Sequence, residues 1–306
     1  MPSLDIIIPA LNAAHCLDGT LRAIAEQKIP AGLSLGTVVV NNASTDDTAV
    51  LIDRWSERSV RRLDYFAEQS RSATRNAGVS ASTADYVLLL DADCRLAHRD
   101  CLSVASEAIA RNVDAAFGYT TGMSTGFWQR YHRSLEAERL LADWRGFTTA
   151  CCLVKRELFN AAGGFSTEYR HYGFEDRDFI CQLNARVGSD ALISLPNLRA
   201  VHDDDLTVPI VCEKMYVAGR YSGEIFKRNF ADEYLATGYA RVDVDTAPRY
   251  ISLVLRGLQP FKAAIIAATD RMTRWRHLPL AIGRPFVRLA SALSYFAGTR
   301  DRSKDL

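Results

Sequence analysis

Strand-like and helix-like stretches alternate three times within the first ninety residues of this 306-residue chain. The strand-like stretches are short apolar runs at residues 4–8, 35–40, 63–66 and 86–90. Apolar residues recur at helical spacing between these runs, at about 17–27, 45–55 and 70–80. Ser44, with Asp47 three residues later, predicts a capping box at the start of the second helix. Because strand, helix and parallel strand in this order form right-handed crossovers, the alternation predicts a parallel sheet covered by helices.

The fourth run, Tyr86–Leu90, is continuous, as expected of a parallel strand that is buried on both faces. It ends abruptly in two carboxylates, Asp91 and Asp93. Open α/β sheets bind ligands at the carboxyl ends of their strands. Two hard oxygen donors at that edge suit a divalent cation that holds a substrate's phosphates. Taken alone, the sequence Asp91-Ala92-Asp93 is more often a solvated turn that closes a strand. The interpretation as a cation site therefore depends on the rest of the chain.

The common phosphate-binding sequences of such sheets are missing. There is no GxGxxG after the first strand and no GxxxxGK[ST] anywhere, which argues against a dinucleotide oxidoreductase and a P-loop enzyme. A net charge of +1 gives no argument for nucleic-acid binding. The seven cysteines contain no CxxC pair, so zinc and redox motifs are unsupported and a reduced, cytosolic protein fits best. We therefore expect any phosphate to be held by a metal ion and by Arg or Lys.

Beyond Asp93 the alternation loosens. Helices are expected at 101–110, 123–144 and 157–162, and strands at 115–120, 148–154, 191–195 and 199–202. Gly163 and Gly164 follow the short helix, where glycine commonly ends one. Apolar residues at helical spacing follow Glu175 and Asp176, so these two acids are expected in the first turn of a helix.

Residues beyond about 208 look helical and more basic. Helices are expected at 216–230, at 250–269 with an interruption at Pro260, and at 278–296 with a kink at Pro285. Arginines and apolar residues are interleaved in the last part, between Arg271 and Leu293. This pattern is typical of a helical cap with a solvated arginine face, and also of a peripheral membrane helix. We expect no spanning helix, because no run of about 18 uncharged apolar residues occurs.

Several short motifs occur in a fixed order along residues 4–205. They are Pro9-Ala10-Leu11-Asn12, Val38–Asp46, Arg75-Asn76, Leu90–Asp93, Gly163-Gly164-Phe165 with Glu168, Glu175-Asp176 and His202. In this order and at these intervals they resemble the inverting family 2 glycosyltransferases. The resemblance implies a GT-A fold, a Rossmann-like and mostly parallel sheet flanked by helices, here with a helical C-terminal extension. It implies a catalytic domain at 1–208, divided into a nucleotide-binding half (1–93) and an acceptor and catalytic half (94–208), with the extension at 209–306.

The resemblance also implies roles for single residues in binding a nucleotide-sugar. Pro9, Ala10 and Asn12 would line the base and ribose end, although a strand terminator and a turn residue explain Pro9 and Asn12 equally well. Asn42 sits where many relatives carry an Asp that hydrogen-bonds the base. Because an amide donates as well as accepts, the base preference is expected to differ from that of uridine-specific relatives. Arg75 would lie beside the diphosphate. The alternative explanation is that Arg75 is an ordinary arginine on the surface of a helix.

The cation site implied by the resemblance would hold Mn²⁺ or Mg²⁺. Asp93 would bind the ion directly, while Asp91 would approach the ribose or a water on the metal, with Ala92 between them. His202 matches a histidine that completes the metal site in some relatives, although a lone histidine is as often structural.

The reaction implied is a metal-dependent, inverting transfer of a sugar from a nucleotide-diphosphate-sugar to a hydroxyl group. Negative charge builds on the leaving phosphate, which a metal ion and an arginine stabilise. The attacking hydroxyl must lose its proton, so a carboxylate is needed as general base. The resemblance assigns that role to the pair Glu175 and Asp176, and we expect Asp176 to be the base. Acids in a first helical turn also simply favour the helix dipole, which is the alternative explanation.

The setting is expected, by family analogy only, to be cell-surface polysaccharide or glycolipid synthesis. The partners would be a nucleotide-sugar donor and a glycan or lipid-linked acceptor, with no nucleic acid. The location would be cytoplasmic, and the basic tail would place the protein at the inner face of the membrane.

Two other functions fit parts of the sequence. A sugar nucleotidyltransferase would use a related half-sheet, but it would carry a glycine-rich, basic loop after the first strand, which residues 9–15 lack. A catalytically silent sugar-nucleotide or carbohydrate-binding protein is supported only by the amides Asn41 and Asn42. The intact acids oppose it, namely Asp91, Asp93, Glu175 and Asp176.

Overall fold

The computed structural model describes residues 1–123, 125–203 and 206–302, and the chain forms two compact units. The first unit comprises residues 1–123, 135–167 and 179–204, and the second comprises 124–134, 168–178 and 205–306. Two short segments from the middle of the chain therefore belong to the second unit together with the C-terminal region. The domain limits expected from the sequence stay a prediction.

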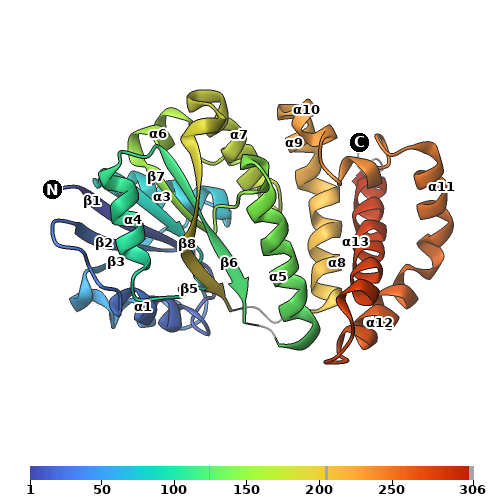
Figure 1. Ribbon diagram of the computed structural model, residues 1–306, viewed down its shortest axis with the longest axis horizontal. Coiled ribbons are helices and arrows are strands. Elements are labelled where there is room, and N and C mark those ends of the chain that lie inside the picture. Colours follow the sequence, from blue (N-terminus) through green and yellow to red (C-terminus); the bar gives the residue numbers. More distant parts are fainter. Residues whose placement is uncertain (124, 204–205, 303–306) are drawn as a thin grey trace. The chain divides into compact units, whose positions relative to one another are not determined.

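The first unit contains a mixed sheet with eight strands among the described residues (Figure 1). The order across the sheet is β3-β2-β1-β4-β7-β6-β8-β5. The strands are β1 Ser3–Ala10, β2 Ser34–Asn41, β3 Val60–Asp64, β4 Tyr86–Leu90, β5 Cys94–Leu96, β6 Ala115–Gly122, β7 Cys151–Lys155 and β8 Leu192–His202. β1 is parallel to β2 and β4, and β2 is parallel to β3, so the predicted parallel half-sheet is confirmed. β7 is antiparallel to both of its neighbours, and β5 is antiparallel to β8.

Helices pack on both faces of this sheet. Those lying wholly in the first unit are α1 Leu17–Ala25, α2 Thr48–Asp53, α3 Arg71–Ser80, α4 Cys101–Ala110 and α6 Arg156–Ala161. Ile6 and Ile8 of β1 belong to one core cluster with buried residues of α1 and α4. Ile7 points to the opposite face, because side chains alternate along a strand. On that face α3 approaches so closely that a Cβ at Gly78 would collide with Ile7.

The second unit is built from helices, which confirms the predicted helical C-terminal region (Figure 1). They are α8 Val208–Val217, α9 Gly223–Asn229, α10 Ala231–Leu235, α11 Arg249–Leu258, α12 Lys262–Thr273 and α13 Leu280–Arg302. A π-helical turn, Ala218–Ser222, joins α8 to α9. A 3₁₀ turn that contains Pro260 joins α11 to α12 at the predicted interruption, and Pro285 lies inside α13. The first turns of α5 (Gly126–Leu141) and α7 (Glu175–Val187) also belong to this unit.

Most elements lie close to their predicted ranges, and β4 and α4 have the predicted bounds. The strands expected at 191–195 and 199–202 form a single strand, β8, whose register against β6 shifts between Phe117 and Tyr119. This irregularity accounts for the break in the apolar pattern. β1 also continues through Pro9. β4 pairs with β1 only up to Ile7, so a proline without an N–H group is tolerated beyond that point.

The predicted capping box at Ser44 is wrong. α2 begins at Thr48, and its N-cap residue Asp47 makes no side-chain cap. The carboxylate of Asp46 instead accepts from the backbone N–H of Thr48 at 3.0 Å. Ser44 Oγ accepts from the backbone N–H of Asn12, so it ties two loops together rather than starting a helix.

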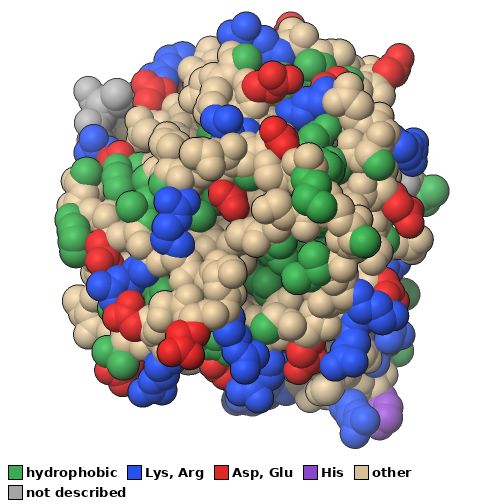
Figure 2. Space-filling view, turned by 90° about the vertical axis from the view of Figure 1, so that its left-hand side faces the viewer, with side chains coloured by type: hydrophobic (Ala, Val, Ile, Leu, Met, Phe, Trp, Pro, Cys, Tyr) green, Lys and Arg blue, Asp and Glu red, His purple; other side chains and the backbone are tan. Residues whose placement is uncertain are grey.

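Charged side chains of both signs are interspersed on the face of the molecule shown in Figure 2. This mixture agrees with the net charge of +1 of the whole chain.

Candidate functional site

The carboxyl ends of β1, β2 and β4 lie along the same edge of the sheet, because these strands are parallel neighbours. The predicted nucleotide and cation residues end or follow these strands, except Arg75, which lies within α3, and His202, which ends β8. β8 pairs with β5, in which Cys94 lies opposite His202. The topology therefore brings His202 beside Asp93, although the two residues are far apart in the sequence.

Asn12 joins the loops after β1 and β2. Its backbone is left-handed, with φ at 50°, a conformation that asparagine tolerates better than most residues. Its Oδ1 accepts from the backbone N–H of Thr45 at 2.8 Å, and its own N–H donates to Ser44 Oγ at 3.0 Å. Ala10 is buried at 1% exposure, and Pro9 is half-buried in the strand. These contacts give Asn12 a clear structural role at the rim where the base and ribose were expected.

Asn42 is buried at 3% exposure, and its amide is occupied by neighbouring residues. The carbonyl oxygens of Tyr65 and Glu68 lie 3.3 and 3.0 Å from one end of the amide, and Thr74 Oγ1 lies 2.7 Å from the other. Because carbonyl oxygens only accept, the NH₂ group faces them and the amide oxygen faces the hydroxyl. The loop after β3 therefore requires an amide at this position, where a carboxylate would face two acceptors.

Arg75 and Asp91, whose side chain is 22% exposed, form a mostly buried ion pair. The Arg75 side chain is 2% exposed, and its Nη2 donates to Asp91 Oδ1 at 2.6 Å. Burial by itself would raise the pKa of Asp91. The positive charges of Arg75 and Arg71 and the hydrogen bond from Arg75 outweigh it, so the pKa of Asp91 is lowered below its ordinary value. Asp91 therefore stays ionised at neutral pH.

Asn76 has a role that the sequence analysis did not identify. Its Nδ2 donates to the Phe165 carbonyl at 2.7 Å, and its Oδ1 accepts from the Phe165 N–H at 2.9 Å. The Phe165 ring in turn lies 5.0 Å from the Arg75 guanidinium. Gly164, with φ at 68°, passes so close that a Cβ there would lie 2.7 Å from Asn76 Oδ1. The Arg-Asn and Gly-Gly-Phe motifs are thus two halves of one interlocked structure.

Asp93 and His202 form the part of the site that is best suited to a cation. His202 Nε2 lies 3.2 Å from Asp93 Oδ2. Asp93 Oδ1 is buried and has no hydrogen-bond partner within the described residues. Asp93, Cys94 and His202 each offer one potential metal-ligand atom, and these three atoms lie within 4.8 Å of one another. Burial, reinforced by Asp91 and Asp93, raises the pKa of the Cys94 thiol well above its ordinary value, so it remains a neutral thiol.

Ala92 lies between the two acids and is half-buried. Its carbonyl oxygen accepts from Thr20 Oγ1 at 2.7 Å, which anchors the Asp-Ala-Asp turn to α1. This contact fixes the backbone of the turn and leaves the side chain of Ala92 without a polar function.

Glu175 and Asp176 begin α7, as predicted, and they belong to the second unit. Glu175 is 5% exposed, and its Oε2 accepts from the Gly173 N–H at 3.0 Å. It is therefore part of the turn that starts the helix. Asp176 is only partly buried, so its carboxylate can meet a substrate.

The residues around Asp176 are firmly held within the second unit. Gly173 and Phe174 both have positive φ, at 105° and 67°. The Phe174 ring packs against Phe226 and Tyr239, with ring centroids 5.3 and 5.0 Å away. Such a left-handed phenylalanine is strained, and backbone strain held by its surroundings is common at functional sites.

Asp178, two residues after Asp176, is 1% exposed and accepts from Tyr169 Oη at 2.9 Å and Asn229 Nδ2 at 3.0 Å. Burial, followed by the charge of Asp178, raises the pKa of Tyr169, so the phenol stays protonated and donates. This third acid of the first turn is structural.

Replacing Asn42 with Asp should destabilise the first unit. The free energy of unfolding is expected to fall by about 1–3 kcal/mol at pH 7, because the new carboxylate faces the carbonyls of Tyr65 and Glu68. Urea denaturation measures the change, and Asn112→Asp at an exposed left-handed position is the control. Equal stability of Asn42→Asp and the wild type would contradict the assigned amide contacts.

Asp91→Asn should remove a pH-dependent part of the stability. The folded-state pKa of Asp91 is lowered, so its ion pair with Arg75 stabilises the fold above the unfolded pKa of about 4 and is lost as the pH falls further. The variant should therefore be less stable at pH 7, by roughly 3–5 kcal/mol, because one member of a mostly buried ion pair has lost its charge. The difference should shrink towards pH 3. Denaturation curves over this range test it, and a difference that does not change with pH would exclude the ion pair as its cause.

The sequence model of Glycosyl transferase family 2 matches residues 5–166. An uncharacterized glycosyltransferase of Haemophilus influenzae is 24% identical over 188 residues, which cover 59% of this chain and 61% of that protein. Chondroitin synthase of Pasteurella multocida is 23% identical over 225 residues, covering 60% of this chain and 23% of the synthase. The chain thus spans less than two thirds of the length of these relatives.

Among solved structures, mannosyltransferase PcManGT from Pyrobaculum calidifontis, in complex with GDP-Man and Mn²⁺, has a TM-score of 0.67 at 20% identity. The match covers 99% of this chain and 87% of that chain. TarS of S. aureus in complex with UDP has a TM-score of 0.57 at 15% identity, covering 100% and 92% of the two chains. These likenesses confirm the predicted GT-A fold. Because the family model matches more than half of its residues, the chain belongs to glycosyl transferase family 2.

Proposed function

We propose that this protein is an inverting glycosyltransferase that moves a sugar from a nucleotide-diphosphate-sugar to a hydroxyl acceptor. The observation that carries the proposal is the pair Asp93 and His202 at the edge of the sheet, with a buried carboxylate oxygen that lacks a hydrogen-bond partner among the described residues. Because a fold alone does not determine a function, the proposal also depends on the membership of the chain in glycosyl transferase family 2.

The donor is proposed to bind across the ends of β1, β2 and β4. Solved structures of similar fold contain GDP-Man or UDP, which supports a nucleotide-sugar. Arg75 would face the diphosphate, with its guanidinium oriented by Asp91 and Phe165. The Asn42 amide is engaged by the loop after β3, so Asn42 would shape the base site through that loop.

The residues present fit a divalent cation. Asp93 and His202 would hold it, with Asp91 nearby, and a carboxylate with an imidazole suits Mn²⁺ better than Mg²⁺. The Mn²⁺ in a mannosyltransferase of similar fold supports this assignment. A cation there would stabilise the charge that develops on the leaving nucleoside diphosphate. Arg75 would add its own positive charge at the same side of the donor.

Asp176 is proposed as the general base that takes the proton from the attacking hydroxyl. Glu175 is buried and bound to Gly173, and Asp178 is buried and bound to Tyr169 and Asn229. Of the three acids in this first turn, Asp176 is thus the most accessible to a substrate. Its neighbours would hold the turn while Asp176 exchanges the proton.

The setting is proposed to be cell-surface polysaccharide or glycolipid synthesis in the cytoplasm. Relatives named for succinoglycan biosynthesis in Rhizobium meliloti and O-antigen biosynthesis in Myxococcus xanthus support it. The acceptor would be a glycan, free or linked to lipid.

A membrane surface is the proposed location, with α11 and α12 as the contact. Within the described residues, the stretch Arg249–Thr273 is apolar and long enough to cross a membrane, and only 6% of its most apolar part is buried. The 3₁₀ turn at Pro260 divides it into two helices of roughly 15 and 18 Å, each shorter than the bilayer core of about 30 Å. α11 is a short, strongly amphipathic helix, and such a helix is suited to lie on a membrane rather than to cross it.

The charge of this region supports an anionic lipid surface. Residues 246–299 contain eight Lys and Arg but one acid, Asp270, which is 7% exposed. The large apolar side chains of Tyr250, Leu253 and Val254 are 57–70% exposed on α11. Exposed apolar groups among positive charges are what an interfacial helix requires.

The donor and cation proposals are tested together by thermal shift with UDP, GDP, dTDP and CDP and their sugars, with and without Mn²⁺. One nucleotide should raise the melting temperature of the wild type only when Mn²⁺ is present. Asp93→Asn should lose that response, while Asp100→Asn at an exposed site should keep it. If no nucleotide raised the melting temperature, with or without Mn²⁺, the proposed function would be refuted.

Asp176→Asn should fold and bind the donor but lose transfer by roughly 10²-fold or more, because the acceptor hydroxyl has no base. Release of nucleoside diphosphate from the donor identified above, in the presence of acceptor, measures the rate. The control is Asp232→Asn, which removes an exposed acid from the first turn of α10. Near-normal turnover of Asp176→Asn would place the base elsewhere.

Co-sedimentation with vesicles tests the membrane proposal. The wild type should bind vesicles that contain phosphatidylserine and should bind less as the salt concentration rises, because opposite charges attract across water. Leu253→Glu combined with Val254→Glu should abolish binding. Ile29→Glu combined with Val50→Glu, at comparably exposed positions of the first unit, should not. Equal binding by both double variants would refute α11 as the contact.

A further inference from the structure

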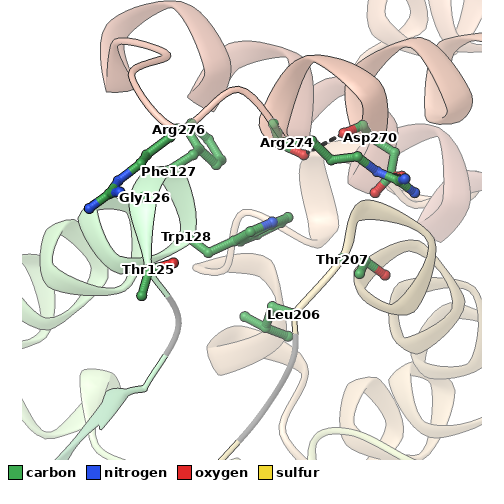
Figure 3. A pocket seen from close by; sticks show the side chains of 10 residues that line it. Thr125, Gly126, Phe127, Trp128, Leu206, Thr207, Asp270, Arg274 and Arg276 are labelled. Carbon is green, nitrogen blue, oxygen red and sulfur yellow. Dashed lines mark hydrogen bonds and ion pairs between the residues drawn. The ribbon is translucent and has the colours of Figure 1, made fainter.

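A hollow of about 380 Å³ lies within the second unit and contains none of the residues assigned above to donor, cation or base. Three chain segments line it: the start of α5, the residues before α8, and the end of α12 with the turn that follows (Figure 3). The lining residues are Thr125, Gly126, Phe127, Trp128, Leu206, Thr207, Asp270, Thr273, Arg274 and Arg276. Its volume is at the lower end of the range of small-molecule sites and has room for a monosaccharide.

Trp128 is one of the apolar residues that line the hollow. Figure 3 shows its side chain reaching between the segment at Thr125 and the segment at Thr207. The indole is held edge-on by Phe127 and Tyr131, with centroids 5.5 and 5.4 Å away, and is 8% exposed. A rigid aromatic ring presents an apolar face with a polar N–H edge, which suits the C–H face of a sugar and its hydroxyls.

The polar side of the hollow carries more positive than negative charge. Asp270 is 7% exposed, and it accepts from the Val208 N–H and from Nε and Nη2 of Arg274, at 3.2, 3.1 and 2.7 Å. The Arg274 side chain is nevertheless 77% exposed, and Arg276 is exposed as well. Two guanidinium groups against one carboxylate leave a net positive charge and hydrogen-bond donors for an anion or for hydroxyls.

The backbone of this wall is fixed in place. Arg130 Nη2 donates to the carbonyls of Arg276 and Leu278, at 3.0 and 2.7 Å. Gly126, with φ at 67°, lets α5 begin beside Arg276, where a Cβ would lie 3.4 Å from its Cα. The hollow is therefore preformed, which lowers the entropic cost of binding.

We propose that this hollow binds a saccharide unit that carries a phosphate or carboxylate group, as part of the acceptor. The sugar ring would stack on Trp128, and Arg274 and Arg276 would bind its negatively charged group. Assignment to the acceptor rests on the proposed glycosyltransferase function, whereas binding of the saccharide does not. The chemistry is shared by sugar phosphates and uronic acids.

Saturation-transfer NMR with glucose 1-phosphate, glucuronate and glucose tests the proposal. The wild type should bind at least one of the two anionic sugars more tightly than glucose. Trp128→Leu should weaken that binding about fivefold or more, from the loss of stacking. Arg276→Gln, at an exposed position that does not endanger folding, should reduce the preference for the anionic sugar. Trp275→Leu and Arg271→Gln, exposed neighbours outside the lining, are the matched controls.

The nucleotide thermal shift is measured on the same variants. It should be unchanged, because none of these residues belongs to the donor site. Absence of saccharide binding by a wild type that still binds nucleotide with Mn²⁺ would overturn the hollow as a site, and so would equal losses in lining and control variants. Equal affinity for glucose and both anionic sugars would overturn the role of the arginines. Saccharide binding without any nucleotide response would refute the proposed function while leaving the saccharide site standing.

Discussion

The buried ion pair between Arg75 and Asp91 is the interaction on which the edge of the sheet depends. Taking both charges out of water costs more than a surface pair would, so such a pair is rarely explained by stability alone. Here it joins the middle of α3 to the turn after β4, and the Arg75 guanidinium also lies over the ring of Phe165, whose backbone is bound by the Asn76 amide. Helix, strand and the glycine turn after α6 therefore cannot shift independently. An arginine oriented in advance loses little entropy when a phosphate arrives, which is the advantage of building the site this way.

The parts of this fold that sequence patterns predicted are those governed by local chemistry. β4 was identifiable because its five residues are all apolar and a polar turn follows at once, and α3 because residues 70–80 follow a helical pattern. The failures have a common physical origin, since each depends on a partner distant in the sequence. β5 has three residues and exists because β8 lies beside it. Ser44 was mistaken for a cap because only the folded chain brings Asn12 to its hydroxyl.

The candidate site shows the same division. The order of the motifs pointed to Asp93 and His202 and to the acids at the start of α7. The choice of Asp176 over Glu175 as the base came from the resemblance alone, and the structure adds that Glu175 is buried and accepts a hydrogen bond from Gly173. Asn76 was visible as half of a motif, but its two bonds to Phe165 required the structure. Asn42 looked like a lost base-binding carboxylate, whereas its surroundings show why an amide is needed there.

Phe174 illustrates how a single residue can restrict what evolution may change. Its left-handed backbone costs on the order of 1–3 kcal/mol, which glycine would relieve, yet its ring fills the space among Phe226, Tyr239 and Tyr295. Glycine would remove the strain and empty the cage, while any other side chain would keep the strain and fit the cage less well. Every substitution at residue 174 therefore has a cost, either in packing or in backbone strain. Variation in this loop is therefore expected to bypass residue 174 and to accumulate at exposed positions such as Arg170 and His171, where new substrate preferences can arise without cost to the fold.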